Sequence, residues 1–135
     1  MSDKFKALVL NQEGENFTRE VMELDKSFLK HGDVTVKVDY SSLNYKDALI
    51  LKDGGKIVRK FPFVPGIDFS GKVVESGDDK FKKDENIICT GFRVGEMYYG
   101  GFSQYAKVDS NFLIKNPKDI DPEKSMMLGL SLIHI

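Results

Sequence analysis

The chain has 135 residues, a length that fits one domain with an ordinary hydrophobic core. Its 20 basic side chains nearly balance 21 acidic ones, and the net charge of -1 gives no general attraction to nucleic acid or to an anionic membrane. No apolar run has the length that a secretory leader or a membrane span requires, which predicts a cytoplasmic protein. Cys89, the single cysteine, lies in an apolar stretch and is expected to pack in a buried strand.

The elements expected in chain order are mostly short strands. Residues 34–41 alternate valine and tyrosine with polar side chains, which predicts a half-buried antiparallel strand with one apolar face. Turn residues separate this strand from its neighbours. The other strands are expected over 5–10, 17–24, 69–76, 85–90 and 102–108.

One short helix is expected in the middle of the chain. Asn44 is a good N-cap for a helix over 45–51, with Ala48, Leu49 and Leu51 facing inward. The glycine pair at 54–55 is expected to end it.

A second helix is expected near the end of the chain. Asp121 and Pro122 are a favourable N-cap and first helical residue, but an apolar stretch closes the chain scarcely two turns later. We expect a domain over 1–129 and, over 130–135, a tail foreign to it or a truncation point. Many short strands with glycine-rich turns and only two short helices predict a mainly β, barrel-like domain.

The chain has no G-x-G-x-x-G loop of the kind that binds a dinucleotide pyrophosphate. Gly54-Gly55 and Gly100-Gly101 are pairs that lack the third glycine, so we expect turn or close-packing roles for them. Any nucleotide-binding domain is therefore expected beyond residue 135.

Three motifs follow one another along the chain: SSLNYKD at 41–47, FVPGIDFSG at 63–71, and GFRVGE at 91–96 with GGFSQYA at 100–106. Together they resemble the catalytic domain of the medium-chain dehydrogenase/reductase superfamily. Within it, they are similar to the zinc-free quinone oxidoreductase group that contains bacterial acryloyl-CoA reductases. The resemblance implies a GroES-like, partly open β-barrel with short helices, packed in the intact protein against a Rossmann domain that this chain lacks.

The resemblance also implies an activity and a site. The activity would be NADPH-dependent hydride transfer to the conjugated double bond of a small enone, a quinone or an acyl-CoA substrate, with this fragment inactive alone. Tyr45 would contact the nicotinamide cofactor, with Asn44 beside it as a cofactor or substrate contact. From the residues alone, Asn44 as a helix cap and Tyr45 as a packing residue is the other interpretation. No general acid is identified, and a homo-oligomer stays open for the full-length protein.

The chain departs from the zinc alcohol dehydrogenases of that superfamily. Those enzymes carry a cysteine at the position of Asn44 and a histidine-glutamate pair at Ile67-Asp68. Because an amide and an alkyl side chain replace two ligands, we predict that the protein binds no metal here. Asp47 and Asp68 are expected to hold loops by hydrogen bonds to backbone amides.

A basic stretch formed by Lys52, Lys56, Arg59 and Lys60 is expected next to that site. It is either a solvated loop or a binding surface for the phosphates of coenzyme A or the 2′-phosphate of NADPH. Arg59 is the best substrate-binding candidate, because a guanidinium matches phosphate geometry. His31 and His134 have no evident partner and are not expected to act as bases.

The alternative from another class is a free-standing GroES-like binding or assembly module without catalysis. The DNA that follows the Gly129 codon discriminates between the two, because an enzyme origin predicts a strand, a G-x-G-x-x-G loop and a helix there.

Overall fold

The computed structural model describes residues 4–30, 32–90 and 94–116, with the backbone alone for 53–57. The second helix expected at Asp121, the tail 130–135, the boundary at 129, His31 and His134 lie outside these residues. The described elements are β1 (Lys4–Glu13), β2 (Asn16–Asp25), a 3-10 turn (Lys26–Phe28), β3 (Val34–Ser41), α1 (Tyr45–Ile57), β4 (Asp68–Ser76), β5 (Asn86–Thr90), β6 (Tyr105–Val108), a 3-10 turn (Ser110–Phe112) and β7 (Leu113–Lys115).

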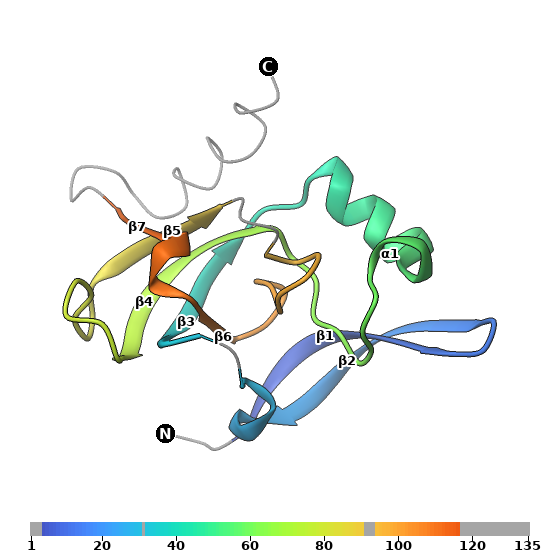
Figure 1. Ribbon diagram of the computed structural model, residues 1–135, viewed down its shortest axis with the longest axis horizontal. Helices are drawn as coiled ribbons and strands as arrows, with labels where there is room; N and C mark the ends of the chain where they lie inside the picture. The colour runs from blue at the N-terminus through green and yellow to red at the C-terminus, as the bar shows by residue number, and fades with distance from the viewer. Residues whose placement is uncertain (1–3, 31, 91–93, 117–135) are drawn as a thin grey trace.

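The strands form two antiparallel sheets that share one segment of chain. β1 and β2 make a hairpin, and the second sheet has the order β6-β3-β4-β5-β7 (Figure 1). Ahead of β6, the amide of Leu8 donates to the carbonyl of Phe102 at 2.8 Å, and the amide of Gln104 to the carbonyl of Lys6 at 2.9 Å. Residues 105–108 then pair with β3. The predicted strand 102–108 therefore joins both sheets, and the expected mainly β, partly open barrel is confirmed.

The alternation predicted for β3 holds over its first half. Val34 and Val36 are fully buried, whereas Tyr40 is 42% exposed although it belongs to the predicted apolar face. The pairing with β4 shifts in register between Val38 and Tyr40. Such an irregularity displaces the two-residue period, so side chains beyond it change faces.

Helix α1 is longer than predicted. It continues through Gly54 and Gly55 to Ile57, so the prediction that this pair stops the helix was wrong. Each glycine costs a helix interior only about 1 kcal/mol relative to alanine. Ile50 of α1 and Val58 just beyond it pack in one buried cluster, and this packing favours the longer helix.

The buried face of α1 also differs from the prediction. Ala48 is exposed and Leu49 is 37% exposed, whereas Asp47 and Ile50 are fully buried. The inward orientation predicted for Ala48 and Leu49 was therefore wrong, and Leu51 is partly buried as expected.

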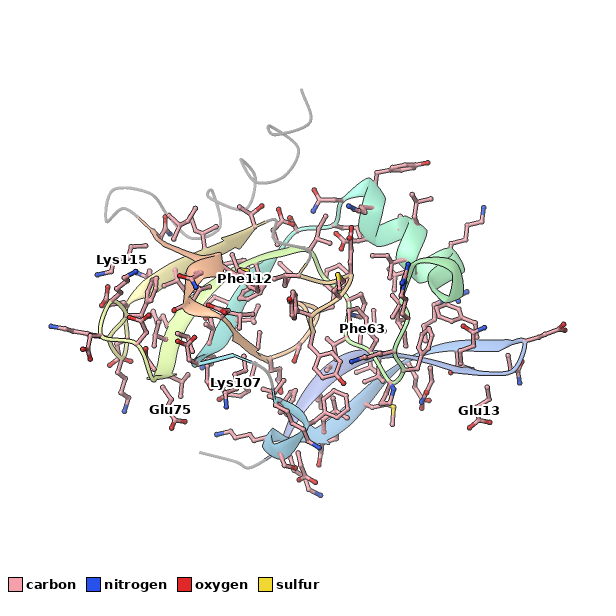
Figure 2. All side chains as sticks on the ribbon, in the orientation of Figure 1. Glu13, Phe63, Glu75, Lys107, Phe112 and Lys115 are labelled. Atoms are coloured by element: carbon pink, nitrogen blue, oxygen red, sulfur yellow. The ribbon has the colours of Figure 1, made fainter. Side chains whose placement is uncertain are left out.

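The interior consists of three apolar clusters. One lies within the five-stranded sheet, one lies under the hairpin, and one fills the space between β1 and α1. Figure 2 shows Phe63 inside the molecule near α1, whereas Glu13 lies at the outer end of the hairpin. The third cluster consists of Leu10, Ile50, Val58 and Phe63, with Phe17, Leu51, Phe61 and Tyr99 packed against it.

Glycines allow three chain segments, around Gly66, Gly95 and Gly100, to pack closely beside the start of β4. Gly66 and Gly95 have φ angles of +112° and +82°, which favour glycine. A Cβ atom on Gly100 would lie 2.1 Å from the carbonyl oxygen of Gly66, and one on Gly101 would lie 2.6 Å from Cβ of Phe69. The close-packing role predicted for Gly100-Gly101 is confirmed, and this packing positions the start of β4.

Candidate functional site

A cluster of polar side chains lies where β3, α1 and β4 meet. Ser42 and Asn44 belong to the loop between β3 and α1, Asp47 to the first turn of α1, and Asp68 is the first residue of β4. Asp47 and Asp68 are fully buried. We call these four residues the Asn44 cluster. Burying two carboxyl groups costs free energy unless hydrogen bonds compensate, so each partner is informative.

Asp47 joins the beginning of α1 to the segment that precedes β4. Its Oδ2 accepts from the backbone amide of Asn44 at 2.9 Å, and its Oδ1 accepts from the backbone amide of Ile67 at 3.0 Å. The first bond is one half of a capping box, in which a side chain of the first turn reaches back to the N-cap amide. The loop-holding role predicted for Asp47 is confirmed.

Asp68 holds the same region through side chains. Its Oδ1 accepts from the hydroxyl of Ser42 at 2.8 Å and from Nδ2 of Asn44 at 2.6 Å. The predicted role in holding loops is therefore correct, but these two donors are side chains rather than the backbone amides that we expected. Ser42 was missed by the sequence analysis, because its partner lies far along the chain.

Burial and the charge of Asp68 shift the pKa values of two side chains in and near the Asn44 cluster. Burial raises the pKa of Asp47 above its ordinary value, and the negative charge of Asp68 adds to the rise, while the bonds from Asn44 and Ile67 counteract it. Cys89 lies on β5, and burial, together with the charge of Asp68, raises the pKa of its thiol to about 12. The packing role predicted for Cys89 is confirmed, because such a thiol is protonated and unreactive at neutral pH.

Tyr45 is the first residue of α1 and its side chain faces solvent. Its side chain is 80% exposed, and the preceding Leu43 is 70% exposed. Lys46 makes an ion pair with Glu96, whose side chain is 8% exposed, and this contact brings the segment around Met97 next to the start of α1. Met97 is itself 57% exposed, so the site carries an open apolar surface beside its polar cluster. Neither residue of the Lys46–Glu96 pair was singled out from the sequence.

The structure separates Arg59 from Tyr45 and Asn44. Arg59 is exposed and lies just beyond the C-terminal end of α1, whereas Asn44 and Tyr45 lie at its beginning. At a rise of about 1.5 Å per residue, the two ends of this helix are roughly 20 Å apart. The expectation that the basic stretch lies next to the site was therefore wrong for Arg59.

Within residues 4–30, 32–90 and 94–116, no three histidine, cysteine, aspartate or glutamate side chains converge as a metal site. At the position of the second ligand of the zinc enzymes, Ile67 presents an alkyl side chain that is 4% exposed. No helix in the described part of the chain is both long and apolar enough to span a membrane.

The architecture defines a small, partly open antiparallel β-barrel domain with a cluster of buried polar side chains where the loop before its helix meets β4. The comparison with known families gives the specific assignment. Residues 30–118 match the alcohol dehydrogenase GroES-like domain, and the chain belongs to this family.

Individual relatives agree with this assignment. Over 123 residues the chain is 45% identical to the probable acrylyl-CoA reductase AcuI of Escherichia coli, covering 91% of this chain and 38% of that protein. The crystal structure of the yhdH oxidoreductase from Salmonella enterica in complex with NADP matches with a TM-score of 0.86 and 42% identity, over 92% of this chain and 38% of the other. The crystal structure of Bacillus subtilis protein yhfP with NAD bound matches with a TM-score of 0.89 and 35% identity, over 95% of this chain and 39% of the other. The chain thus spans less than half the length of these relatives.

Proposed function

We propose that this domain is the substrate-side part of a cytoplasmic, NADPH-dependent oxidoreductase. The reaction would reduce the conjugated double bond of a small enone, a quinone or an acryloyl-CoA-type substrate. The observation that carries the proposal is the pairing of an exposed Tyr45 ring with the Asn44 amide at one helix end, in a chain similar to an acrylyl-CoA reductase and to an NADP-bound oxidoreductase.

The side chains at this end of α1 fit the nicotinamide portion of such a cofactor. The Tyr45 ring offers an exposed apolar face for an uncharged heterocycle, and the amide of Asn44 is partly exposed beside it. NADPH, when bound, supplies the hydride. Tyr45 holds the nicotinamide ring in place, and the apolar side chains of Leu43 and Met97 exclude water from it. Hydride transfer to the β-carbon leaves an enolate, which would take its proton from water or from a ribose hydroxyl of the cofactor.

We further propose that the reaction proceeds without zinc. The nitrogen of the Asn44 amide donates to Asp68 at 2.6 Å and Ile67 has no donor atom in its side chain, so the cluster lacks the convergent ligands that catalytic zinc requires. The substrate carbonyl is then polarised by hydrogen bonds, which suits an activated double bond. Elemental analysis of an active preparation with one zinc per chain, lost together with activity on chelation, would contradict this part.

Arg59 fits a second contact with an elongated substrate. Because it lies roughly 20 Å from Tyr45 along α1, it would meet a phosphate of coenzyme A rather than the reacting carbons. Arg59→Ala should raise KM for a coenzyme A thioester and leave KM for a small enone unchanged. Lys52→Ala, which removes another exposed cation of the same stretch, is the matched control.

The test of the cofactor contact uses a chimera in which residues 1–129 of this chain replace the corresponding stretch of the Escherichia coli relative. Tyr45→Ala should weaken NADPH binding by about tenfold, the loss expected for one aromatic contact of roughly 1.4 kcal/mol. Tyr45→Phe keeps the ring and should bind nearly as the parent chimera does. If both variants keep the affinity and turnover of the parent, Tyr45 does not contact the cofactor.

A further inference from the structure

The direction of the Asn44 amide is fixed by its neighbours. An ionised carboxylate accepts hydrogen bonds and cannot donate them. Two carboxylate oxygens lie near Nδ2 of Asn44: Oδ1 of Asp68 at 2.6 Å and Oδ2 of Asp47 at 3.3 Å. With the amide reversed, its carbonyl oxygen would face both acceptors in a buried environment, at a large electrostatic cost. The nitrogen therefore faces inward.

The hydroxyl oxygen of Ser42 is a third hydrogen-bond acceptor for Nδ2 of Asn44. The Ser42 hydroxyl donates to Oδ1 of Asp68 at 2.8 Å, so its oxygen is available as an acceptor, and it lies 3.1 Å from Nδ2 of Asn44. Three acceptors thus surround the two hydrogens of one amide group. Asn44 has no hydrogen left for a ligand, and the group that it can offer is its carbonyl oxygen, Oδ1.

We infer, building on the proposed function, that Asn44 binds its ligand as a hydrogen-bond acceptor. The partner of Oδ1 is then an N–H or O–H donor of the nicotinamide nucleotide, from the carboxamide or from a ribose hydroxyl. It is not the carbonyl of the substrate, and the donors for a developing enolate come from groups other than Asn44. Asp68 and Asp47 are positioning residues, because they act on the ligand through the orientation of this amide.

Nuclear magnetic resonance of the isotope-labelled chain tests the orientation directly. Both side-chain amide protons of Asn44 should exchange slowly with water, and a scalar coupling across the hydrogen bond should connect Nδ2 to the carboxyl carbon of Asp68. Fast exchange of both protons, with no such coupling, would overturn the inference. This measurement needs no ligand and no variant.

Titration of the chimera, with its residues 1–129 isotope-labelled, with reduced nicotinamide mononucleotide tests the binding mode. The carbonyl carbon of the Asn44 side chain should shift on binding, while its two amide protons keep their positions. The 3-acetylpyridine analogue lacks the carboxamide N–H. Loss of the carbon shift with this analogue identifies the carboxamide as the donor, and an unchanged shift identifies the ribose hydroxyl.

The outcomes separate the inference from the proposed function. Shifts at Tyr45 together with displaced Asn44 amide protons would leave the cofactor contact standing and overturn the acceptor role. An absence of shifts throughout the domain at the solubility limit of the nucleotide would contradict both. Shifts confined to residues away from α1 would likewise contradict both.

Variants separate positioning from general stability. Asp68→Asn replaces the acceptor by a group that can also donate, so the Asn44 amide should lose its single orientation, and its protons should exchange about tenfold faster, the effect of one ordinary hydrogen bond. The carbon shift induced by the nucleotide should shrink in parallel. Asp78→Asn, which changes an aspartate of the distant β4–β5 turn, should leave both readouts as in the unmodified chain. Equal behaviour of the two variants would overturn the positioning role of Asp68.

Discussion

Substitution of Asp47 by alanine should destabilise the domain through two backbone amides. In the folded chain this carboxylate accepts from Ile67, a residue that is 4% exposed, and from Asn44, which is partly exposed. A buried amide left without an acceptor costs about 1–3 kcal/mol, and water can replace the acceptor at the more exposed amide. We therefore expect a loss of about 2–3 kcal/mol in the free energy of unfolding, most of it from Ile67.

The direction in which that loss of stability changes with pH is a second, independent prediction. The pKa of Asp47 is raised above its ordinary value of 3.8, so the folded state binds this proton more tightly than the unfolded state does. The stability that Asp47 contributes is complete below 3.8 and falls as the pH rises through the raised pKa of the folded state. The difference in the free energy of unfolding between the unmodified chain and Asp47→Ala should therefore decrease as the pH rises from 3.8 through the raised pKa.

Urea unfolding across a pH series measures both effects. Asp47→Asn is the control, because it keeps one acceptor oxygen and should lose less stability. The difference between the two variants should not depend on pH in this range, because neither variant carries the titrating carboxyl group. The reasoning is refuted if Asp47→Ala unfolds within about 0.5 kcal/mol of the unmodified chain, the range of an ordinary surface substitution.

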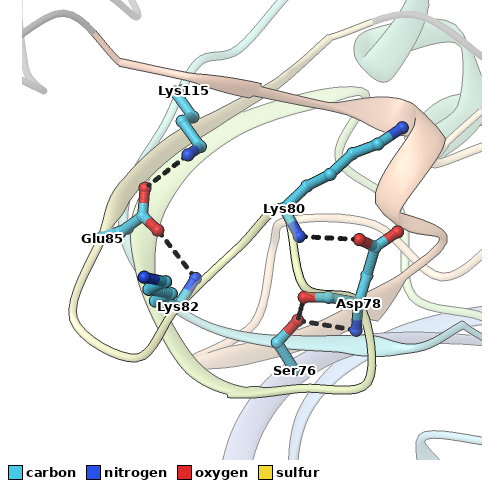
Figure 3. A network of polar contacts seen from close by, with 6 residues as sticks. All are labelled: Ser76, Asp78, Lys80, Lys82, Glu85 and Lys115. Atoms are coloured by element: carbon cyan, nitrogen blue, oxygen red, sulfur yellow. Dashed lines mark hydrogen bonds and ion pairs between the residues drawn. The ribbon is translucent and has the colours of Figure 1, made fainter.

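Three further predictions concern the packing and the surface network. Gly100→Ala would place Cβ 2.1 Å from a backbone oxygen and should cost more than about 3 kcal/mol by urea unfolding, whereas Gly77→Ala, with its nearest atom at 3.4 Å, should stay near neutral. Cys89, with a pKa of about 12, should not react with a thiol reagent at pH 8 until guanidinium unfolds the chain; rapid reaction of the folded chain would show that β5 is open to solvent. Asp78 accepts from the backbone of Lys80 and from Ser110, and these bonds lower its pKa (Figure 3 shows the first). The stability that the Asp78 carboxylate contributes is present above its ordinary pKa of 3.8 and is lost as the pH falls through the lowered pKa. Asp78→Asn should therefore destabilise the folded chain at neutral pH and have no effect in strong acid. A loss of stability that does not depend on pH would contradict these two hydrogen bonds as the cause.

Strands with a clear alternation of apolar and polar residues were predicted correctly, whereas elements that depend on contacts distant in the sequence were not. The bounds of β3 agree with the prediction because its alternation is a property of neighbouring residues. β7 was not predicted, since three residues with one buried side chain carry no recognisable period. The end of α1 was misplaced because the glycine pair is a local signal, and packing of Ile50 against Leu10 and Phe63 overrides it.

The same error explains why Arg59 was misplaced. A helix that ends before Gly54 would leave Arg59 in a loop free to return to Asn44, whereas a helix that continues to Ile57 carries it to the far end. The bonds from Ser42 and Asn44 to Asp68 join residues from different elements, and no spacing within one segment reveals them. The identities of Asn44 and Tyr45 as candidates came from the motif, and the direction of the Asn44 amide comes from the structure alone.

Isotope transfer in the chimera tests the central claim most directly. NADPH that carries deuterium at the transferred position of its nicotinamide is mixed with acryloyl-CoA and the chimera, and the product is analysed by mass spectrometry and nuclear magnetic resonance. The proposed function predicts one deuterium at the β-carbon of the product, and about tenfold slower transfer in Tyr45→Ala when the NADPH concentration is well below its Kd. A folded chimera that binds NADPH, transfers no deuterium to acryloyl-CoA or to a small enone, and does not oxidise NADPH in the presence of a quinone would contradict it.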